Sequence, residues 1–430
     1  MIKTILRILL FLFLIASGHQ STAQTQPWVK LQSPVNTTLR YLCFVDSLTG
    51  WAAGEEGGII NTTDGGNNWE IQNSLVTTFI MDIFFIDKNT GWALTIKDVF
   101  PFNSVLLRTT NGGSDWSQEN FPDSLGLIRT IFFFDSLYGF IGGSFINYTS
   151  DGGFSWSPVN IDSNIVSNFP VYKFNFLNRK FGYACGGRLD VAGVVWRTTN
   201  YGLNWTAQGI SADEVFDIFI FDSLNAITLS GDPEGLFPVA NLKTTDSGIS
   251  WNYNELPFFG LSFEIDFRTY NEGWSASGYK FLLTTNRGET WSEFDTPDST
   301  VVYDLQFTDA RNGYAVGENG TILKLDPSLV GVENFSVIPE KIVLYQNYPN
   351  PFNPSTKISF RISDGGLVSL FIYDVLGNKV ATLLNDYKTV GEYEVEFNPK
   401  SNNRDFASGT YFYQLKFGDF VQFKKMIYLK

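Results

Sequence analysis

The chain has 430 residues, of which 44 are Asp or Glu and 30 are Lys or Arg, for a net charge of −14 with histidine neutral. The acidic excess lies between residues 24 and 331, where 34 acids stand against 17 bases. Such a surface repels phosphate backbones, which excludes nucleic acid as a partner. The single histidine, His19, falls in a segment that we predict to be removed. Ser-His-Asp and Cys-His catalysis and histidine ligation of a metal are therefore excluded, and we expect no metal and no cofactor.

The N-terminus has the composition of a secretory signal peptide. Lys3 and Arg7 supply positive charge, residues 8–16 are almost wholly apolar, and Ser21-Thr22-Ala23 offers a small-residue cleavage site. We therefore predict a signal peptide over residues 1–23. No later apolar run reaches the length of a membrane span, so we expect no transmembrane segment in the mature chain.

A turn with the pattern Thr-x-Asp/Asn-x-Gly-x-x-Trp occurs six times. The Asp or Asn side chain is expected to accept hydrogen bonds from nearby backbone N–H groups, the glycine to take a positive φ, and the Trp to begin the next strand. Because half of the copies carry Asn, we interpret these side chains as structural and not catalytic. The structural positions are Asp64, Trp69, Asn111, Trp116, Asp151, Trp156, Asn200, Trp205, Asp246, Trp251, Asn286 and Trp291.

Between these turns a second phrase, Phe-x-Asp followed by Gly-aromatic-Ala, recurs in seven more or less degenerate copies, first at Phe44-Val45-Asp46 and Gly50-Trp51-Ala52. Each unit has the pattern of four short strands rich in aromatic and β-branched residues, without an amphipathic helix. Four strands in a repeat of about 40–50 residues are typical of a propeller blade. The predicted fold class is all-β, with a seven-bladed β-propeller over residues 24–326.

The seventh unit ends near Lys324 without its turn and its Trp. The missing strand is present at the other end of the chain, in residues 27–31. We predict that the strand with Trp28 completes the seventh blade and closes the ring, which hides the open edges of an unfinished blade. Cys43 and Cys185 fall on different strands in blades one and four, so we predict two buried free thiols and no disulfide.

No Trp occurs after Trp291, and the composition changes near Glu340. We predict a linker over residues 327–339. Residues 340–430 consist of alternating strands and turns, which favours a small C-terminal β-sandwich.

Both halves resemble known families. The repeated turn resembles the Asp-box, or BNR, repeat, and with the Gly-Trp-Ala phrase it resembles the photosystem II assembly and stability factor family of seven-bladed propellers. Residues 348–353 (Tyr-Pro-Asn-Pro-Phe-Asn), 373–377 and 408–411 resemble the type A C-terminal sorting domain of type IX secretion cargo. That resemblance implies passage through the periplasm, contact of residues 340–430 with the type IX secretion machinery, and a protein that is secreted or attached to the outer surface.

The residue that opens each blade's innermost strand is predicted to face one mouth of the central channel. Like charges crowded at such a position raise pKa values or attract a cation. A hydrated rim without a ligand is the alternative interpretation. The candidate ligand-binding residues are Asp82, Lys173, Asp217, Glu264 and Asp304.

The same face is predicted to carry the long loops between the second and third strands of blades two, four and five, which favours it as the working surface. Exposed aromatic side chains in such loops anchor protein or glycan partners; alternatively, they fold over the blade tops. The candidate loop contacts are Phe100, Phe102, Arg188, Asp232, Glu234 and Phe237.

These observations predict a secreted or cell-surface binding module with a protein or carbohydrate ligand, and they assign no catalytic residue. One alternative is a secreted Asp-box glycoside hydrolase that uses Asp217 and Glu264 as its carboxylate pair. Sialidases need three converging arginines. This chain offers Arg40 and Arg129 on first strands but no third strand-borne arginine on that face. The other alternative, an assembly factor for a membrane complex, follows only from the family resemblance.

Overall fold

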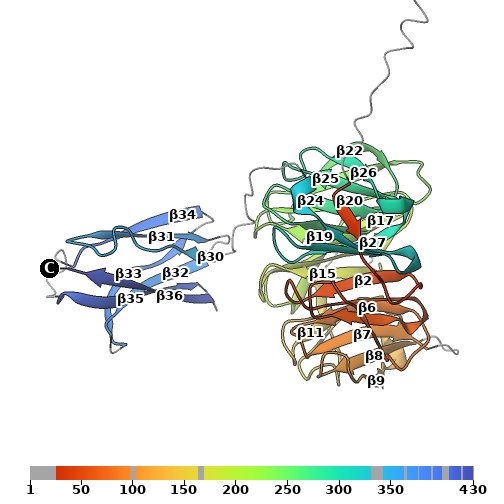
Figure 1. The fold of residues 1–430 in the computed structure, drawn as a ribbon, viewed down its shortest axis with the longest axis horizontal. Coiled ribbons are helices and arrows are strands. Elements are labelled where there is room, and N and C mark those ends of the chain that lie inside the picture. The colour runs from red at the N-terminus through yellow and green to blue at the C-terminus, as the bar shows by residue number, and fades with distance from the viewer. Residues whose placement is uncertain are drawn as a thin grey trace, which may run out of the picture.

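The computed structural model describes residues 26–97, 103–162, 169–330, 342–362, 366–375, 377–388, 391–399, 406–417 and 420–429. The predicted signal peptide (residues 1–23), the candidate contacts Phe100 and Phe102, and most of the predicted linker lie outside these residues. The described chain is almost entirely β-structure (Figure 1). Its short 3-10 segments are η1 (Glu55–Gly57), η2 (Asp123–Leu125), η3 (Pro297–Ser299), η4 (Glu318–Gly320) and η5 (Pro327–Leu329).

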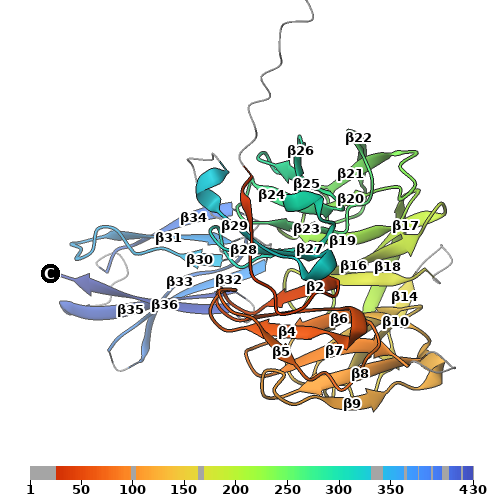
Figure 2. The ribbon, with the colours of Figure 1, turned by 45° about the vertical axis from the view of Figure 1, so that its right-hand side comes forward.

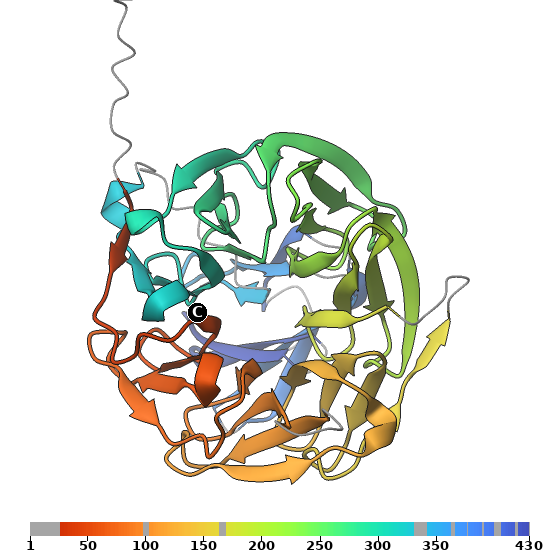
Figure 3. The same ribbon diagram turned by 90° about the vertical axis from the view of Figure 1, so that its right-hand side faces the viewer.

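Within the described residues, β1 to β29 form seven sheets, six of four strands and one of five. Each inner strand contacts the inner strand of the next sheet, and the last contacts the first, so the sheets form a closed ring around an axis (Figure 3). We number these blades one to seven by their inner strands. The inner strands are β2 (Leu39–Phe44), β6 (Ile80–Phe85), β10 (Ile128–Phe133), β15 (Val171–Phe176), β19 (Val215–Ile220), β23 (Glu264–Phe267) and β27 (Val302–Phe307).

Each blade continues outward by antiparallel pairing. The second strands are β3 (Gly50–Gly54), β7 (Gly91–Ile96), β11 (Gly139–Gly143), β16 (Gly182–Arg188), β20 (Ala226–Ser230), β24 (Gly273–Ser277) and β28 (Gly313–Gly317). The third strands are β4 (Ile59–Thr62), β8 (Ser104–Thr109), β12 (Ile146–Thr149), β17 (Ala192–Thr198), β21 (Pro238–Thr244), β25 (Lys280–Thr284) and β29 (Ile322–Leu325). The outer strands of blades one to six are β5 (Glu70–Gln72), β9 (Ser117–Asn120), β13 (Ser157–Pro158), β18 (Asn204–Ser211), β22 (Asn252–Phe259) and β26 (Ser292–Asp295). In blade four, β14 (Asn160–Asp162) adds a fifth strand parallel to β18.

The outer strand of blade seven is β1 (Trp28–Lys30), which pairs antiparallel with β29 (Figure 2). In this pairing Trp28 lies opposite Leu325. The Trp28 indole is 1% exposed. Its ring centroid lies 4.8 Å from that of Phe281 and 5.7 Å from that of Trp274, both in blade six. Blade seven is therefore built from the two ends of the propeller sequence. Its outer strand, β1, also contacts blade six through Trp28.

The Gly-aromatic phrase forms the joints between blades. A Cβ at Gly91 would lie 2.3 Å from the ring of Phe85, so only glycine leaves room for that ring. Trp51 of blade one stacks on the same Phe85 ring at 3.5 Å. Blade five, the most degenerate repeat, has Ile220 in place of the phenylalanine and Ala226 in place of the glycine, and the two residues pair with each other. The two replacements therefore depend on each other, because Ile220 is smaller than phenylalanine and leaves room for the Cβ of Ala226.

The six Asp-box turns fold as the residue types predict. In the first copy, the Asp64 carboxylate accepts a hydrogen bond from Asn68 N (2.9 Å), and Gly66 has a φ of 80°. Asn111 Oδ1 accepts the equivalent bond from Asp115 N, four residues on (3.0 Å), so Asp and Asn make the same turn hydrogen bond in these two copies. The buried Thr62 hydroxyl accepts from Gly66 N (3.0 Å) and donates to Asp64 (2.9 Å), a role that the sequence did not reveal.

The C-terminal region has two sheets. One has the strand order β30 (Ile342–Leu344), β31 (Thr356–Ile362) and β34 (Gly391–Phe397), and the other the order β33 (Lys379–Lys388), β32 (Gly366–Tyr373), β35 (Gly409–Phe417) and β36 (Phe420–Tyr428). Both sheets contribute to one apolar core, which includes Phe360 from β31, Leu370 from β32 and Met426 from β36.

Candidate functional site

The seven inner strands begin at one end of the ring axis. We define the axial mouth as the residues at the corresponding early positions: Arg40 and Tyr41, Met81 and Asp82, Arg129 and Thr130, Tyr172 and Lys173, Phe216 and Asp217, Phe263 and Glu264, and Tyr303 and Asp304. The structure brings the five predicted charged residues together there. The Lys173 ammonium interacts electrostatically with Glu264, Asp304, Asp217 and Asp82, although the five come from different blades.

Three of these carboxylates join neighbouring blades. Each accepts a hydrogen bond from a backbone N–H on the inner edge of the next blade, where no further strand offers a carbonyl. The bonds run from Ile131 N to Asp82 Oδ2 (2.9 Å), from Leu42 N to Asp304 Oδ2 (2.7 Å) and from Ile265 N to Asp217 Oδ2 (3.2 Å). These acids therefore hold the ring together, whatever else they do.

A second layer of side chains does the same work further along the inner strands. The hydrogen bonds run from Phe307 N to Asp266 Oδ2 (2.7 Å), from Phe44 N to Gln306 Oε1 (2.7 Å), from Asn175 Nδ2 to Ile218 O (3.0 Å) and from Phe85 N to Cys43 Sγ (3.3 Å). Cys43 and Cys185 are both buried free thiols, as the sequence predicted. Burial raises the pKa of the Cys43 thiol to about 12, so it remains protonated at neutral pH.

Lys173 and Glu264 form an ion pair between blades four and six, with Nζ 2.9 and 3.0 Å from the two carboxylate oxygens. Asp217, in the intervening blade five, is 4% exposed. Its Oδ2 accepts from Ile265 N, but its buried Oδ1 has no hydrogen-bond partner among the described residues. A buried carboxylate oxygen without a donor is rare in folded proteins and calls for an explanation.

Burial dominates the electrostatics of the axial mouth. It raises the pKa of Asp304 to about 7 and that of Asp82 to about 6, although the Lys173 charge opposes the shift at both carboxyls. Burial and the Asp217 charge also raise the pKa of Glu264. Burial would lower the pKa of Lys173, but the four surrounding carboxylates outweigh it and the pKa rises well above the usual lysine value.

A collar of aromatic and guanidinium groups accompanies these charges. Six of the inner strands carry a β-bulge at this point, and bulges redirect side chains. We define the aromatic collar as six half-buried residues in contact along an arc. The contacts are Arg40 over Tyr303 (4.0 Å), Tyr303 with Phe263 (5.3 Å), Phe263 with Phe216 (5.8 Å), Phe216 with Tyr172 (5.3 Å), and Arg129 over Tyr172 (5.5 Å).

The aromatic collar was not among the predicted features, although the sequence carries a signal for it. Each collar residue is the first of the two axial-mouth residues on its strand, as Phe216 stands directly before Asp217. In a regular strand this neighbour would point to the opposite face. In the seven aligned repeats, this position holds four aromatic residues, two arginines and a methionine.

The predicted loop contacts that the structure describes differ in their exposure to solvent. Arg188, Glu234 and Phe237 are exposed, and Phe237 is 61% exposed. Asp232, by contrast, is buried, and its carboxylate accepts from the backbone N–H groups of Glu234 (2.8 Å), Leu236 (2.7 Å) and Phe237 (3.0 Å). Asp232 therefore stabilises its own loop, and its contact with a ligand stays a prediction.

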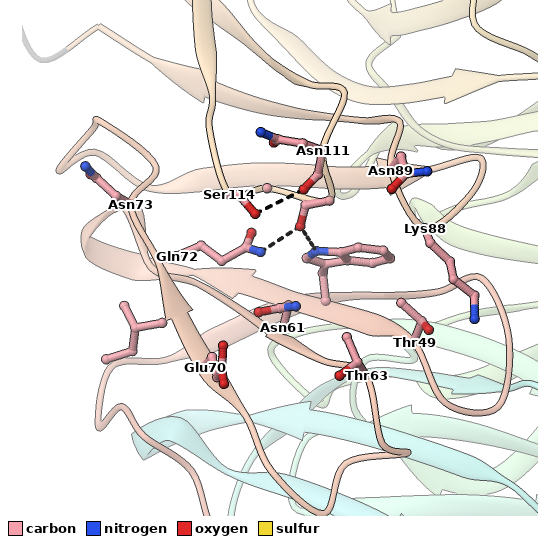
Figure 4. A pocket seen from close by; sticks show the side chains of 14 residues that line it. Thr49, Asn61, Thr63, Glu70, Gln72, Asn73, Lys88, Asn89, Asn111 and Ser114 are labelled. Atoms are coloured by element: carbon pink, nitrogen blue, oxygen red, sulfur yellow. Dashed lines mark hydrogen bonds between the residues drawn. The ribbon is translucent and has the colours of Figure 1, made fainter.

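A cavity of about 480 Å³ lies elsewhere, between blades one and two on the side of the Asp-box turns (Figure 4). The Trp51 indole N–H and the Gln72 amide both donate to Gly112 O across the joint, at 3.0 and 2.7 Å. Its wall consists mainly of amide and hydroxyl side chains, with Glu70 and Lys88 as charged members, and Lys88 is paired with Asp46. The cavity is a polar seam between blades, and no sequence pattern marked it.

The closed ring of seven sheets and the six Asp-box turns define an Asp-box β-propeller. Residues 20–118 match the family described as photosynthesis system II assembly factor YCF48, and residues 346–429 match the secretion system C-terminal sorting domain. The chain thus combines a YCF48-like propeller with a type IX sorting domain, which implies export to the cell surface or beyond. In the part of the chain that the structure describes, no helix has the length and apolar character needed to span a membrane.

The photosystem II stability/assembly factor HCF136 of Arabidopsis thaliana is 29% identical over 84 residues, which cover 18% of this chain and 21% of that protein. The match thus spans about a fifth of this curated relative. A structure of YCF48 bound to a D1 peptide is similar with a TM-score of 0.57 and 20% identity, over 70% of this chain and 97% of that chain. The GH74 enzyme of Niastella koreensis has a TM-score of 0.55 and 13% identity, over 78% of this chain and 59% of that chain. At these identities the structural likeness shows the fold alone.

Proposed function

We propose that the propeller is an exported binding module that holds a peptide segment of a partner protein at the axial mouth. The aromatic collar carries this proposal. Half-buried rings such as Phe216 and Phe263 offer a large contact area with few rotatable bonds, which is the composition of protein-binding hot spots. The exposed Phe237 and Leu236, in a loop of blade five, extend the apolar area available to a partner.

Hydrolysis of a glycan is less well supported. A glycosidase needs two carboxyl groups that are free to act on the sugar. Here Asp217 accepts from Ile265 N with one oxygen, and both oxygens of Glu264 are held by Lys173. An assembly factor for a membrane complex would be a special case of the proposed peptide binding.

The test uses the full-length secreted protein, screened against a displayed peptide library and a glycan array. We expect peptide ligands whose affinity falls at least tenfold in the Phe216→Ala variant. Tyr253→Ala, an exposed aromatic on the outer strand β22, is the matched control and is expected to bind normally. Glycan cleavage that disappears in Asp217→Asn and Glu264→Gln would instead establish the hydrolase, and glycan binding without peptide binding would refute the peptide proposal.

A further inference from the structure

Two rings of the aromatic collar are each covered by a guanidinium group of the protein itself. The Arg40 guanidinium lies 4.0 Å from the Tyr303 ring centroid, and the Arg129 guanidinium lies 5.5 Å from that of Tyr172. Both distances are in the range of cation–π attraction. The two rings between the tyrosines, Phe216 and Phe263, are half-buried, and no cation of the described residues is placed over either of them.

An acidic residue directly follows each of these two rings in the chain, Asp217 after Phe216 and Glu264 after Phe263. Glu264 is neutralised by Lys173, but Asp217 has no ion-pair partner among the described residues, and its Oδ1 has no donor. The guanidinium groups of Arg40 and Arg129 belong to blades one and three, whereas Phe216 and Phe263 belong to blades five and six. A cation on these rings would therefore lie near a carboxylate on which Lys173 acts without a direct ion pair, and away from the two arginines of the collar.

Charge over a longer range acts in the same direction. Residues 24–331 carry 34 acidic and 17 basic side chains, so the propeller attracts cations from solution. Aromatic faces are surfaces on which proteins bind ammonium and guanidinium groups.

We propose that Phe216 and Phe263, with the neighbouring Asp217, form a binding site for an organic cation, namely the guanidinium or ammonium group of a basic side chain. This inference rests on the proposed function and specifies its ligand. The peptide segment would present an Arg or a Lys, which docks on the two rings that lack an arginine, beside the Tyr303 and Tyr172 rings that already hold one each. The cationic group of the ligand would be the direct ion-pair partner that Asp217 lacks among the described residues.

The experiment measures, by calorimetry on the full-length protein, the affinity for a short arginine-containing peptide and for the same peptide with citrulline, the neutral isostere of arginine. We expect the arginine peptide to bind at least about tenfold more tightly and to weaken as salt rises. Asp217→Asn and Phe216→Leu should each remove that preference. Glu255→Gln and Tyr253→Leu, exposed positions of β22, are the matched controls and should keep it.

A second arm uses free butylguanidinium. Binding as tight as that of the peptide would identify a small organic cation as the ligand, and weaker binding would identify a basic segment of a protein; both support the cation site. If Asp217→Asn fails to fold, Phe216→Leu and Phe263→Leu carry the test, because both side chains are half-buried. Equal binding of the arginine and citrulline peptides would overturn the inference and leave the peptide-binding proposal standing. If no library peptide binds at all, both proposals fail.

Discussion

Replacement of Trp28 tests how the ring is closed. The indole is 1% exposed, stacks on Phe281 and meets Trp274 edge to face. Truncation of such a buried Trp to Ala costs about 3–5 kcal/mol, through lost burial and the cavity that remains. Since β1 is the outer strand of blade seven and packs against blade six, the loss falls on the closing joint of the ring. For a domain of this size we expect Tm to drop by roughly 5–15 °C.

Tryptophan fluorescence is a suitable assay because all 11 tryptophans lie between Trp28 and Trp291, so the signal reports the propeller and not the C-terminal region. Denaturant unfolding of Trp28→Ala and Trp28→Phe should give a large and a smaller loss of stability. Val29→Ala is the matched control, because Val29 lies on the same strand, is 48% exposed and keeps its backbone pairing with Lys324. If Trp28→Ala unfolds within 1 kcal/mol of the control, closure by β1 does not stabilise the ring.

Four further outcomes are expected. Burial raises the pKa of Asp304 to about 7, so this carboxyl stabilises the fold fully below about pH 4 and the contribution is lost as pH rises through 7. Denaturant unfolding should show a loss of stability between pH 5.5 and pH 8 to which Asp304 contributes about 2 kcal/mol, beside Asp266 and Asp82, whose pKa values burial also raises. Asp304→Asn should reduce the loss by that amount, and an unchanged loss would contradict the assignment. Glu272→Gln should cost about 3–5 kcal/mol, because it leaves the buried charge of Arg268 without its carboxylate, and a Tm equal to that of the wild type would exclude this. Asp64→Asn should keep the wild-type Tm while Asp64→Ala lowers it, since Asn111 makes the same turn bonds; equal losses would show that the charge matters. A tagged protein that lacks residues 340–430 should accumulate in the periplasm, and its appearance in the medium would refute the sorting role.

The sequence predicted the elements that depend on local chemistry. The box turns could be read because Asp, Asn and Gly act within a few residues of themselves, and the strand with Trp28 could be placed because one repeat lacked its Trp. The sequence shows that blade five departs most from the repeat, but not why. The structure explains the departure, because Ile220 and Ala226 pair with each other and replace the usual Phe and Gly together.

The contacts between blades were not predictable in the same way. Asp82 was expected to face a ligand, but its carboxylate accepts from Ile131 N in the next blade. Adjacent blades do not pair through strands, so the repeat alignment carries no register between them and could not show which N–H lies opposite which carboxylate. The aromatic collar was hidden for a related reason, because strand alternation assigns Phe216 and Asp217 to opposite faces unless a bulge intervenes.

The pairing of β1 with β29 has a consequence for how this molecule is made. Trp28 and Leu325 are register partners although about 300 residues separate them along the chain. Contacts of such long range form late and slowly, because the intervening chain must be ordered before its ends meet. A chain that emerges from its N-terminus first therefore carries the β1 strand unpaired until β29 has also emerged. The propeller cannot be completed blade by blade, and an interrupted chain would expose the Trp28 side chain and a strand edge to aggregation.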